Sequence, residues 1–437
     1  MLLLKRYFYK LLYRYLSLYV RPEDTVVEIN HPFIDSKTLS LKSELCSKIF
    51  SRHIESTADY QTLKDIKPEY IILNGTIHYE RDIDALFKKI HNNSTPSTRV
   101  IITYYSSLWK PVLKLATLCG FRDKTAEQNW IAPEDIENIL ALSNFESLLD
   151  DGKIICPVYI PVISTILNRY VAPLPVFRAF CLLHILVARP LLPGGTAKPS
   201  VTVVVPARNE SANIENVIKR VPAMGADDEL IFVEGHSSDD TWEKIQEMQR
   251  KYSATRNIVI AQQEGTGKGD AVRKGFDLAS KDILMILDAD LTVPPESLPL
   301  FYDAITENKG EFINGSRLVY PMEDKAMRFF NMVGNKFFAR AFSYVLNQKF
   351  KDTLCGTKAV SRENYRKIAA HRNFFGEFDP FGDFDLIFGA IRLGLKIREI
   401  PVRYKDRTYG STNINRWRDG AALFRMLLYA ARKIKFV

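Results

Sequence analysis

The sequence predicts an α/β protein built from two domains, and three observations support this prediction. The chain has 437 residues, enough for two or three domains, with the ordinary globular composition of 46% hydrophobic and 25% charged residues. Short β-branched runs alternate with segments of helical periodicity, as in sheets covered by helices. A proline- and glycine-rich stretch, "ARPLLPGGTAKPS" (188–200), separates two halves. We therefore predict a first domain over residues 1–190, a linker over 191–199 and a second domain over 200–437.

Charge and cysteine content limit the possible partners and compartment. The formal net charge is +9, which favours an anionic membrane surface or phosphorylated substrates. No zinc-finger pattern or long basic run is present, so nucleic acid is not a predicted partner. The five cysteines are scattered and never form a C-x-x-C pair, which is typical of reduced thiols in a cytoplasmic protein.

The N-terminal stretch "MLLLKRYFYKLLYRYLSLYV" resembles a signal peptide only superficially. Lysines and arginines interrupt its apolar residues throughout, and no small-residue cleavage site follows. We expect a basic amphipathic helix there, either the first helix of the domain or a surface anchor.

The first domain shows alternating strand and helix patterns. Strands are expected at 25–29, 70–75 and 99–105, and helices at 81–91 and 108–119. This alternation predicts a parallel sheet with helices on its faces.

Segment 154–192 is apolar and aromatic, but five prolines interrupt it. It either packs the two domains together or lies against a bilayer, and the sequence leaves both open.

The stretches "RPEDTVVEIN" and "EYIILNGTIHYERDIDALFKKI" resemble class I S-adenosylmethionine-dependent methyltransferases over roughly residues 8–160. That family has a glycine-rich loop after its first strand, where the cofactor binds. Here Glu28 is followed by "INHPFID", which contains no glycine, and Asn30, His31 and Pro32 would fill the space. We therefore predict a degenerate methyltransferase-like domain without the cofactor. Two alternatives are an active methyltransferase, which would make the protein bifunctional, and a non-catalytic docking module.

The second domain places polar turns after buried strands. "VTVVVPARNE" is a strand followed by a turn whose Asn209 and Glu210 could cap the next helix. "DELIFVEGHSSDDT" repeats the design with a strand at 230–233 and then Glu234, and "QEGTGKGDAVRKGFDLA" brings Lys268 and Arg273 into a helix. Turns at the carboxyl ends of strands are where α/β proteins bind nucleotides.

The stretch "DILMILDADLTVPPE" (282–296) ends a buried strand with two carboxylates, Asp288 and Asp290. Residues two apart on an extended chain point to the same side, so both side chains are expected to face one point. Two oxygen donors with open space in front suit Mg²⁺ or Mn²⁺, which retains positions for phosphate oxygens.

Together these stretches resemble the family 2 glycosyltransferases, inverting enzymes with a nucleotide-sugar GT-A fold, over nearly all of 200–415. The nearest branch is that of the dolichyl- and polyprenyl-phosphate hexosyltransferases. Further matching segments are "GSRL", "DTLCGTKAVSR", "FDLIFGAIRLGLKIREIPVRY" and "RTYGSTN", with Asn413 at a position where the family usually has lysine.

The resemblance implies transfer of a hexose from a UDP- or GDP-sugar to a polyprenyl phosphate or lipid-linked glycan. It implies donor-binding residues Pro206, Ala207, Arg208, Asn209, Glu210, Glu234, Lys268 and Asp288. The metal, Mg²⁺ or Mn²⁺, is expected on Asp288 and Asp290.

The acceptor decides which further residues are needed. A sugar hydroxyl needs a base, for which Asp385 or Asp383 is the candidate. A lipid phosphate is largely dianionic at pH 7 and needs cations instead, for which Arg317, Lys358 and Arg407 are the candidates.

The C-terminal stretch "NRWRDGAALFRMLLYAARKIKFV" mixes bulky apolar and basic residues, as interfacial helices do. The alternative is a final helix packed on the core with a solvated basic edge. From the interpretation as an interfacial helix, we predict a cytoplasmic protein bound peripherally at the inner face of the membrane.

Overall fold

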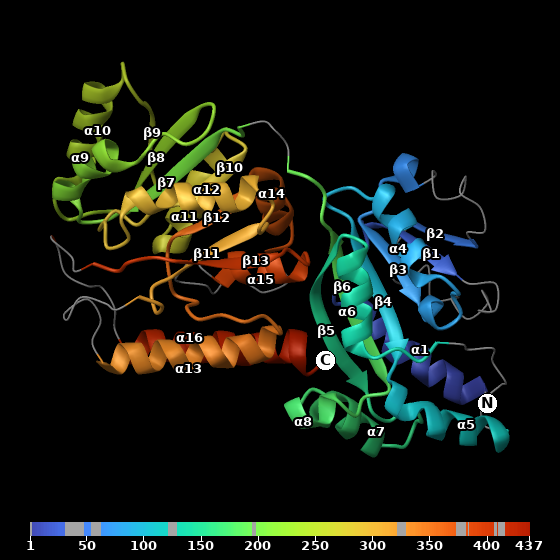
Figure 1. Ribbon diagram of the computed structural model, residues 1–437. Helices are drawn as coiled ribbons and strands as arrows, with labels where there is room; N and C mark the ends of the chain where they lie inside the picture. The colour runs from blue at the N-terminus through green and yellow to red at the C-terminus, as the bar shows by residue number, and fades with distance from the viewer. Residues whose placement is uncertain are drawn as a thin grey trace. The chain divides into compact units, whose positions relative to one another are not determined.

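The computed structural model describes residues 2–30, 48–53, 63–120, 129–194, 198–320, 329–372, 382, 384–405, 409 and 416–437. The chain divides into two compact units (Figure 1). Unit 1 comprises Met1–Leu192 together with Arg432–Val437, and unit 2 comprises Pro193–Ala431. The division falls within the predicted linker, but the last six residues pack with unit 1 and not with the domain predicted over 200–437.

Unit 1 contains a six-stranded sheet in the order β2-β1-β3-β4-β6-β5. Its strands are β1 (Thr25–Asn30), β2 (Lys48–His53), β3 (Tyr70–Asn74), β4 (Arg99–Tyr105), β5 (Phe145–Ile154) and β6 (Leu183–Pro190). The first four are parallel neighbours, whereas β6 is antiparallel to both β4 and β5. The expected strands are present, but the expectation of a purely parallel sheet is wrong, because the apolar segment 154–192 supplies the antiparallel strand β6.

Helices cover both faces of this sheet, because side chains alternate along each strand. Val27 packs with Phe87 in one buried cluster, and Val26 packs with Leu12 in the other. The helices are α1 (Leu2–Leu16), η2 (Thr76–His78), α4 (Ile83–Asn92), η3 (Ser107–Trp109), α5 (Lys110–Leu118), α6 (Pro133–Leu142), α7 (Ile163–Ile166), η4 (Leu167–Val171) and α8 (Pro175–Arg178).

The C-terminal residues are anchored inside unit 1. Lys435 is buried, and burial lowers its pKa to about 8 while Asp151 opposes that shift. Arg169 Nε donates a hydrogen bond of 3.0 Å to the carbonyl of Phe436, whose ring stacks on Tyr170.

Unit 2 contains a seven-stranded mixed sheet in the order β13-β11-β12-β10-β7-β8-β9. Its strands are β7 (Val201–Ala207), β8 (Asp228–Glu234), β9 (Asn257–Gln262), β10 (Ile283–Ile286), β11 (Phe312–Ser316), β12 (Lys358–Ser361) and β13 (Ile397–Pro401). Strands β10, β7, β8 and β9 are parallel neighbours, so their carboxyl ends meet at one edge. Strand β12 runs antiparallel between β10 and β11.

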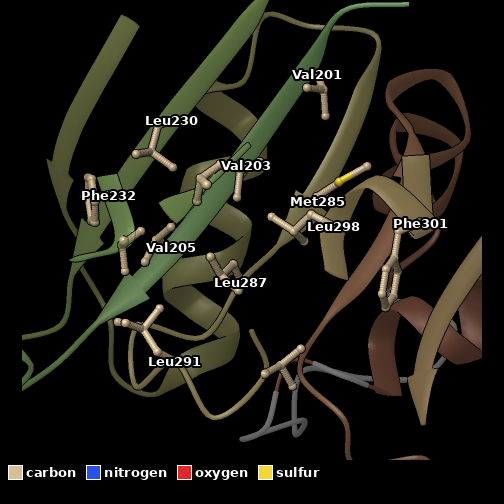
Figure 2. Packing of buried hydrophobic residues seen from close by; sticks show 14 of the residues in the cluster. Val201, Val203, Val205, Leu230, Phe232, Met285, Leu287, Leu291, Leu298 and Phe301 are labelled. Carbon is tan, nitrogen blue, oxygen red and sulfur yellow. The ribbon is translucent and has the colours of Figure 1, made fainter. Parts of the chain in front are cut away.

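The core of unit 2 lies between this sheet and the helices on its faces (Figure 2). Val203 and Phe232 point to the face that packs against Leu298. On the other face α11 approaches β7 closely, since a Cβ on Gly275 would collide with Val204. The helices are α9 (Ser211–Arg220), α10 (Thr241–Tyr252), α11 (Lys268–Leu278), η5 (Pro295–Ser297), α12 (Leu298–Thr306), α13 (Phe329–Leu346), α14 (Arg362–Ala370), α15 (Phe384–Arg392) and α16 (Arg416–Ala430); η7 (Ala431–Lys435) follows α16, and its residues from Arg432 on belong to unit 1. The predicted α/β architecture is confirmed in both units.

Helices α13 and α16 lie side by side in unit 2 (Figure 1). They bury residues such as Phe342 and Met426 and leave Phe337 and Phe424 exposed. Within the part of the chain that the structure describes, none of the helices combines the length and the apolar character required to span a bilayer.

Candidate functional site

The turns after β7 and β8 are adjacent because the two strands are in parallel register. Pro206 pairs with Val233 and Ala207 with Glu234, so both strands end at the same level. Arg208 follows β7 and is exposed. The structure thus brings the predicted donor residues of the two turns together.

Hydrogen bonds between these turns fix their shape. Asn209 adopts a left-handed backbone conformation with φ 56°. Its N–H donates to Ser237 Oγ at 3.0 Å, and its side-chain oxygen accepts from the Ser238 N–H at 2.8 Å. The Gly235 N–H donates to the carbonyl of Ala207 at 2.9 Å. Asn209 therefore joins the two turns and does not cap α9.

The two glutamates are also held within the protein. Glu234 is buried and accepts from the Ser237 N–H at 2.5 Å and from Gln262 Nε2 at 3.0 Å. Burial opposes ionisation, but these hydrogen bonds hold the pKa of Glu234 below its ordinary value. Glu210 occupies the N-cap position of α9 without a capping side-chain bond, and its carboxylate accepts from Asn213 Nδ2 at 2.8 Å. The expectation that Asn209 and Glu210 cap this helix is wrong, since both side chains have these other partners.

An ion pair lies beyond the end of β10. Lys268, the first residue of α11, places Nζ 2.6 Å from Asp288 Oδ1. The side chains are 28% and 27% exposed, so a solute can reach both. Burial alone would raise the pKa of Asp288, but the charges of Lys268, Lys358 and Arg317 hold it below its ordinary value. The carboxylate is therefore ionised at neutral pH.

The Lys268–Asp288 pair occupies space that a side chain at position 356 would fill. A Cβ on Gly356 would lie 2.7 Å from Asp288 Oδ1, and closer still to Oδ2 and to Lys268 Nζ. The segment before β12 therefore approaches the two charged groups by lacking a side chain.

Asp290 differs from Asp288 in its surroundings. It is buried, and its Oδ1 accepts from the Thr292 N–H at 3.1 Å and from Thr292 Oγ1 at 2.8 Å. Strand β10 ends at Ile286, and a turn follows in which Leu291 has φ 55°. The sequence argument assumed an extended chain through both aspartates, and that assumption is wrong.

Two carboxylates are too few to enclose a metal ion alone. The described residues contain no group of three or more histidine, cysteine, aspartate or glutamate side chains that could hold one. Asp288 and Asp290 nevertheless offer hard oxygen donors, and Mg²⁺ is commonly bound by one or two carboxylates together with substrate phosphates. Of these two donors, the partly exposed Asp288 suits a divalent ion that arrives with a diphosphate, whereas Asp290 is buried and bonded to Thr292.

Helix α11 also contacts the predicted catalytic carboxylate. Arg273 Nη1 lies 3.2 Å from Asp385 Oδ2, and the Asp385 side chain is 11% exposed. Residues 268 and 273 are separated by about 7 Å along a helix axis. Helix α11 thus supplies two cations: Lys268 contacts Asp288, and Arg273 contacts Asp385. Asp383 lies outside the described residues.

The predicted acceptor cations are placed deeper than expected. Arg317 Nε and Nη2 donate to Asp352 at 2.7 and 2.9 Å, and Asp352 is fully buried. Burial alone would lower the pKa of Arg317, but Asp352 raises it above its ordinary value. Lys358 is buried on β12 and donates to the carbonyl of Cys355. Arg407 lies outside the described residues.

Sequence reasoning did not identify Gly356 and Asp352 as site residues, and it did not predict that Arg273 pairs with Asp385. Asp352 and Gly356 lie in the quoted segment "DTLCGTKAVSR", but nothing local shows which side chains they meet. The sequence places Arg273 on the same helix as Lys268, but nothing local indicates that it pairs with Asp385.

Comparison with known proteins identifies unit 2. Residues 202–369 match the family described as Glycosyl transferase family 2. Glycosyltransferase AglJ of Haloferax volcanii is 30% identical over 235 residues, covering 53% of this chain and 72% of the relative. The dolichyl-phosphate hexose transferase of the same organism is 30% identical over 222 residues, covering 51% and 89%. The chain belongs to glycosyltransferase family 2.

As a family 2 member, the protein is a glycosyltransferase. Among solved structures, glucosyl-3-phosphoglycerate synthase of Mycobacterium tuberculosis aligns at 21% identity over 55% of this chain and 81% of its own. The TM-score is 0.39, a similarity too low to transfer any detail of its site.

Proposed function

We propose that the protein transfers a hexose from a UDP- or GDP-sugar to a polyprenyl phosphate, with inversion at the anomeric carbon and with Mg²⁺ or Mn²⁺. The observation that carries this proposal is the partly exposed Lys268–Asp288 pair, which lies beyond the end of β10 in a family 2 unit. A phosphate acceptor is favoured by similarity to a relative named dolichyl-phosphate hexose transferase.

On this proposal the charged pair opens when the donor binds. Lys268 would move onto the diphosphate, while Asp288 and Asp290 would hold the metal ion. When bound, the ion would neutralise charge on the departing nucleotide. The turns after β7 and β8, including Pro206–Glu210 and Glu234, would hold the base and ribose.

The acceptor oxygen would attack the anomeric carbon from the face opposite the diphosphate. A bond forms between that oxygen and the carbon as the bond to the nucleoside diphosphate breaks. A dianionic phosphate needs no base, so Asp385 would position the acceptor through Arg273. A lipid-linked glycan acceptor would instead require Asp385, or Asp383, to remove a hydroxyl proton.

Peripheral membrane association belongs to the same proposal. Exposed Phe337 on α13 and Phe424 and Leu428 on α16 stand beside exposed basic residues such as Arg340 and Arg425. Apolar and basic side chains on one helix pair suit the surface of an anionic bilayer. This arrangement supports a location at the inner face of the membrane.

We further propose that unit 1 has a degenerate methyltransferase-like fold. The strand order β2-β1-β3-β4-β6-β5, with antiparallel β6 between two strands of the opposite direction, supports it. The glycine-free segment after Glu28 that argues against cofactor binding lies largely outside the described residues.

Replacement of Asp290 tests the proposed reaction. The full chain is assayed with UDP- and GDP-hexoses, a short-chain polyprenyl phosphate or a soluble glycan, and Mg²⁺ or Mn²⁺. We expect Asp290→Ala to lower kcat/KM at least about 10²-fold, because one metal ligand is lost, and Asp303→Ala on the exposed surface of α12 to change it little. Unimpaired transfer by Asp290→Ala would disprove the metal role, and transfer to the glycan alone would exclude the phosphate acceptor.

A further inference from the structure

Unit 1 carries an unusual concentration of exposed apolar side chains. Of the 26 large hydrophobic side chains that are exposed in the described part of the chain, 15 lie in two stretches, 108–118 and 158–180. Leu118 is 84% exposed and Val176 70%. We call these two stretches the apolar face. They comprise η3 and α5 on one side and α7, η4 and α8 on the other, all in one part of unit 1 (Figure 1).

The apolar face is held in place by buried polar contacts. Asn168 is buried, and its side-chain oxygen accepts from the N–H groups of Ile155 and Cys156 at 3.0 and 2.8 Å. Its amide nitrogen donates to the carbonyl of Cys156 at 2.8 Å. Trp109 Nε1 donates to the carbonyl of Phe180 at 2.9 Å, which joins the two stretches. The exposed side chains therefore project from an ordered framework.

The charges of the apolar face have one sign. Its charged residues are Lys110, Lys114, Arg169 and Arg178, and neither stretch contains an aspartate or glutamate. Lys110 and Lys114 are exposed, whereas Arg178 pairs with Asp151 at 3.5 Å and Arg169 donates to the carbonyl of Phe436. Trp109, Tyr159 and Tyr170 supply aromatic side chains of the kind that settle at headgroup level. Soluble proteins rarely leave so many large apolar side chains exposed in one region without a partner.

We propose that the apolar face of unit 1 docks into the interfacial region of an anionic lipid bilayer. Apolar side chains enter the boundary between headgroups and acyl chains, and Lys110 and Lys114 contact lipid phosphates. This membrane site lies in unit 1, whereas α13 and α16 belong to unit 2. Its existence does not depend on the proposed sugar transfer.

Vesicle binding of the full chain tests this proposal. The partition coefficient is measured by sedimentation with phosphatidylcholine vesicles containing about one third phosphatidylglycerol. We expect Leu115→Ser/Leu118→Ser and Val176→Ser/Phe177→Ser each to lower the partition coefficient at least about tenfold, because fewer apolar groups are then buried in the bilayer. The matched control is Leu142→Ser, since Leu142 is 68% exposed in the same unit but outside the apolar face. Pure phosphatidylcholine vesicles are expected to bind more weakly.

Two further measurements keep the test decisive. Brominated lipids are expected to quench tryptophan fluorescence in the natural protein and to quench it less in Trp109→Phe. This variant keeps the exposed aliphatic side chains of the apolar face unchanged. Size-exclusion chromatography with light scattering reports self-association. The proposal is overturned if the double variants bind vesicles normally while Phe424→Ser/Leu428→Ser does not bind. It is also overturned if the double variants only convert a dimer into a monomer, since a second copy would then cover the face.

Discussion

Replacing Gly356 by alanine should damage the site while leaving the fold intact. The added Cβ would lie 2.7 Å from Asp288 Oδ1 and nearer to Oδ2 and Lys268 Nζ, whereas comfortable contact needs about 3.5 Å. The atoms in the way are ends of flexible side chains, so they move by about 1 Å and the backbone stays. A misplacement of about 1 Å in a catalytic group can cost about 10²-fold in rate.

We therefore expect Gly356→Ala to lower kcat/KM about 10²-fold, while the thermal unfolding midpoint falls by only a few degrees, as for mild overpacking of about 1 kcal/mol. Activity is measured with whichever nucleotide sugar supports turnover, and stability by circular dichroism. The control is Gly334→Ala on α13, where a Cβ would meet nothing within 4 Å. Natural activity in Gly356→Ala would show that the Lys268–Asp288 arrangement is not needed for transfer.

Two further predictions concern stability and ligand binding. Asp352→Asn leaves Arg317, whose side chain is only 12% exposed, without its ionised partner and is expected to destabilise unit 2 by about 3–5 kcal/mol in urea unfolding. Glu296→Gln, which breaks the exposed pair with Arg220, should cost under about 1 kcal/mol in the same measurement. Equal effects of the two changes would contradict the reasoning. Titration of the full chain with S-adenosylmethionine in a calorimeter should give no binding heat, and saturable binding would instead favour the bifunctional alternative.

Local patterns in the sequence predicted the central elements well. The strand expected at 99–105 coincides with β4, and the one expected at 25–29 differs from β1 by one residue. Both are runs rich in β-branched or aromatic residues, which fit the pleated and buried surface of a sheet. The same applies to the buried strand before Asp288, whose four residues are all fully buried in β10.

Pairings between distant residues could not be predicted in this way. Arg317 and Asp352 are separated by 35 positions and meet because β11 and the segment before β12 lie together. The antiparallel strand β6 was obscured because prolines surround it in an apolar stretch. The turn at Asp290 was missed because the extended-strand pattern was continued past its last paired residue, Ile286.

The electrostatics of the candidate site explain how one arrangement can be both stable and ready to bind. Lys358 is fully buried, and its charge lowers the pKa of Asp288 together with the charges of Lys268 and Arg317. The Lys268–Asp288 pair is partly exposed, and such pairs contribute about 1 kcal/mol or less. Breaking it therefore costs little compared with the new contacts that a diphosphate offers to an ammonium group and a divalent ion offers to a carboxylate. On the proposed function, Lys268 would pass from this partly exposed pair to the donor diphosphate, while Lys358 stays buried on β12.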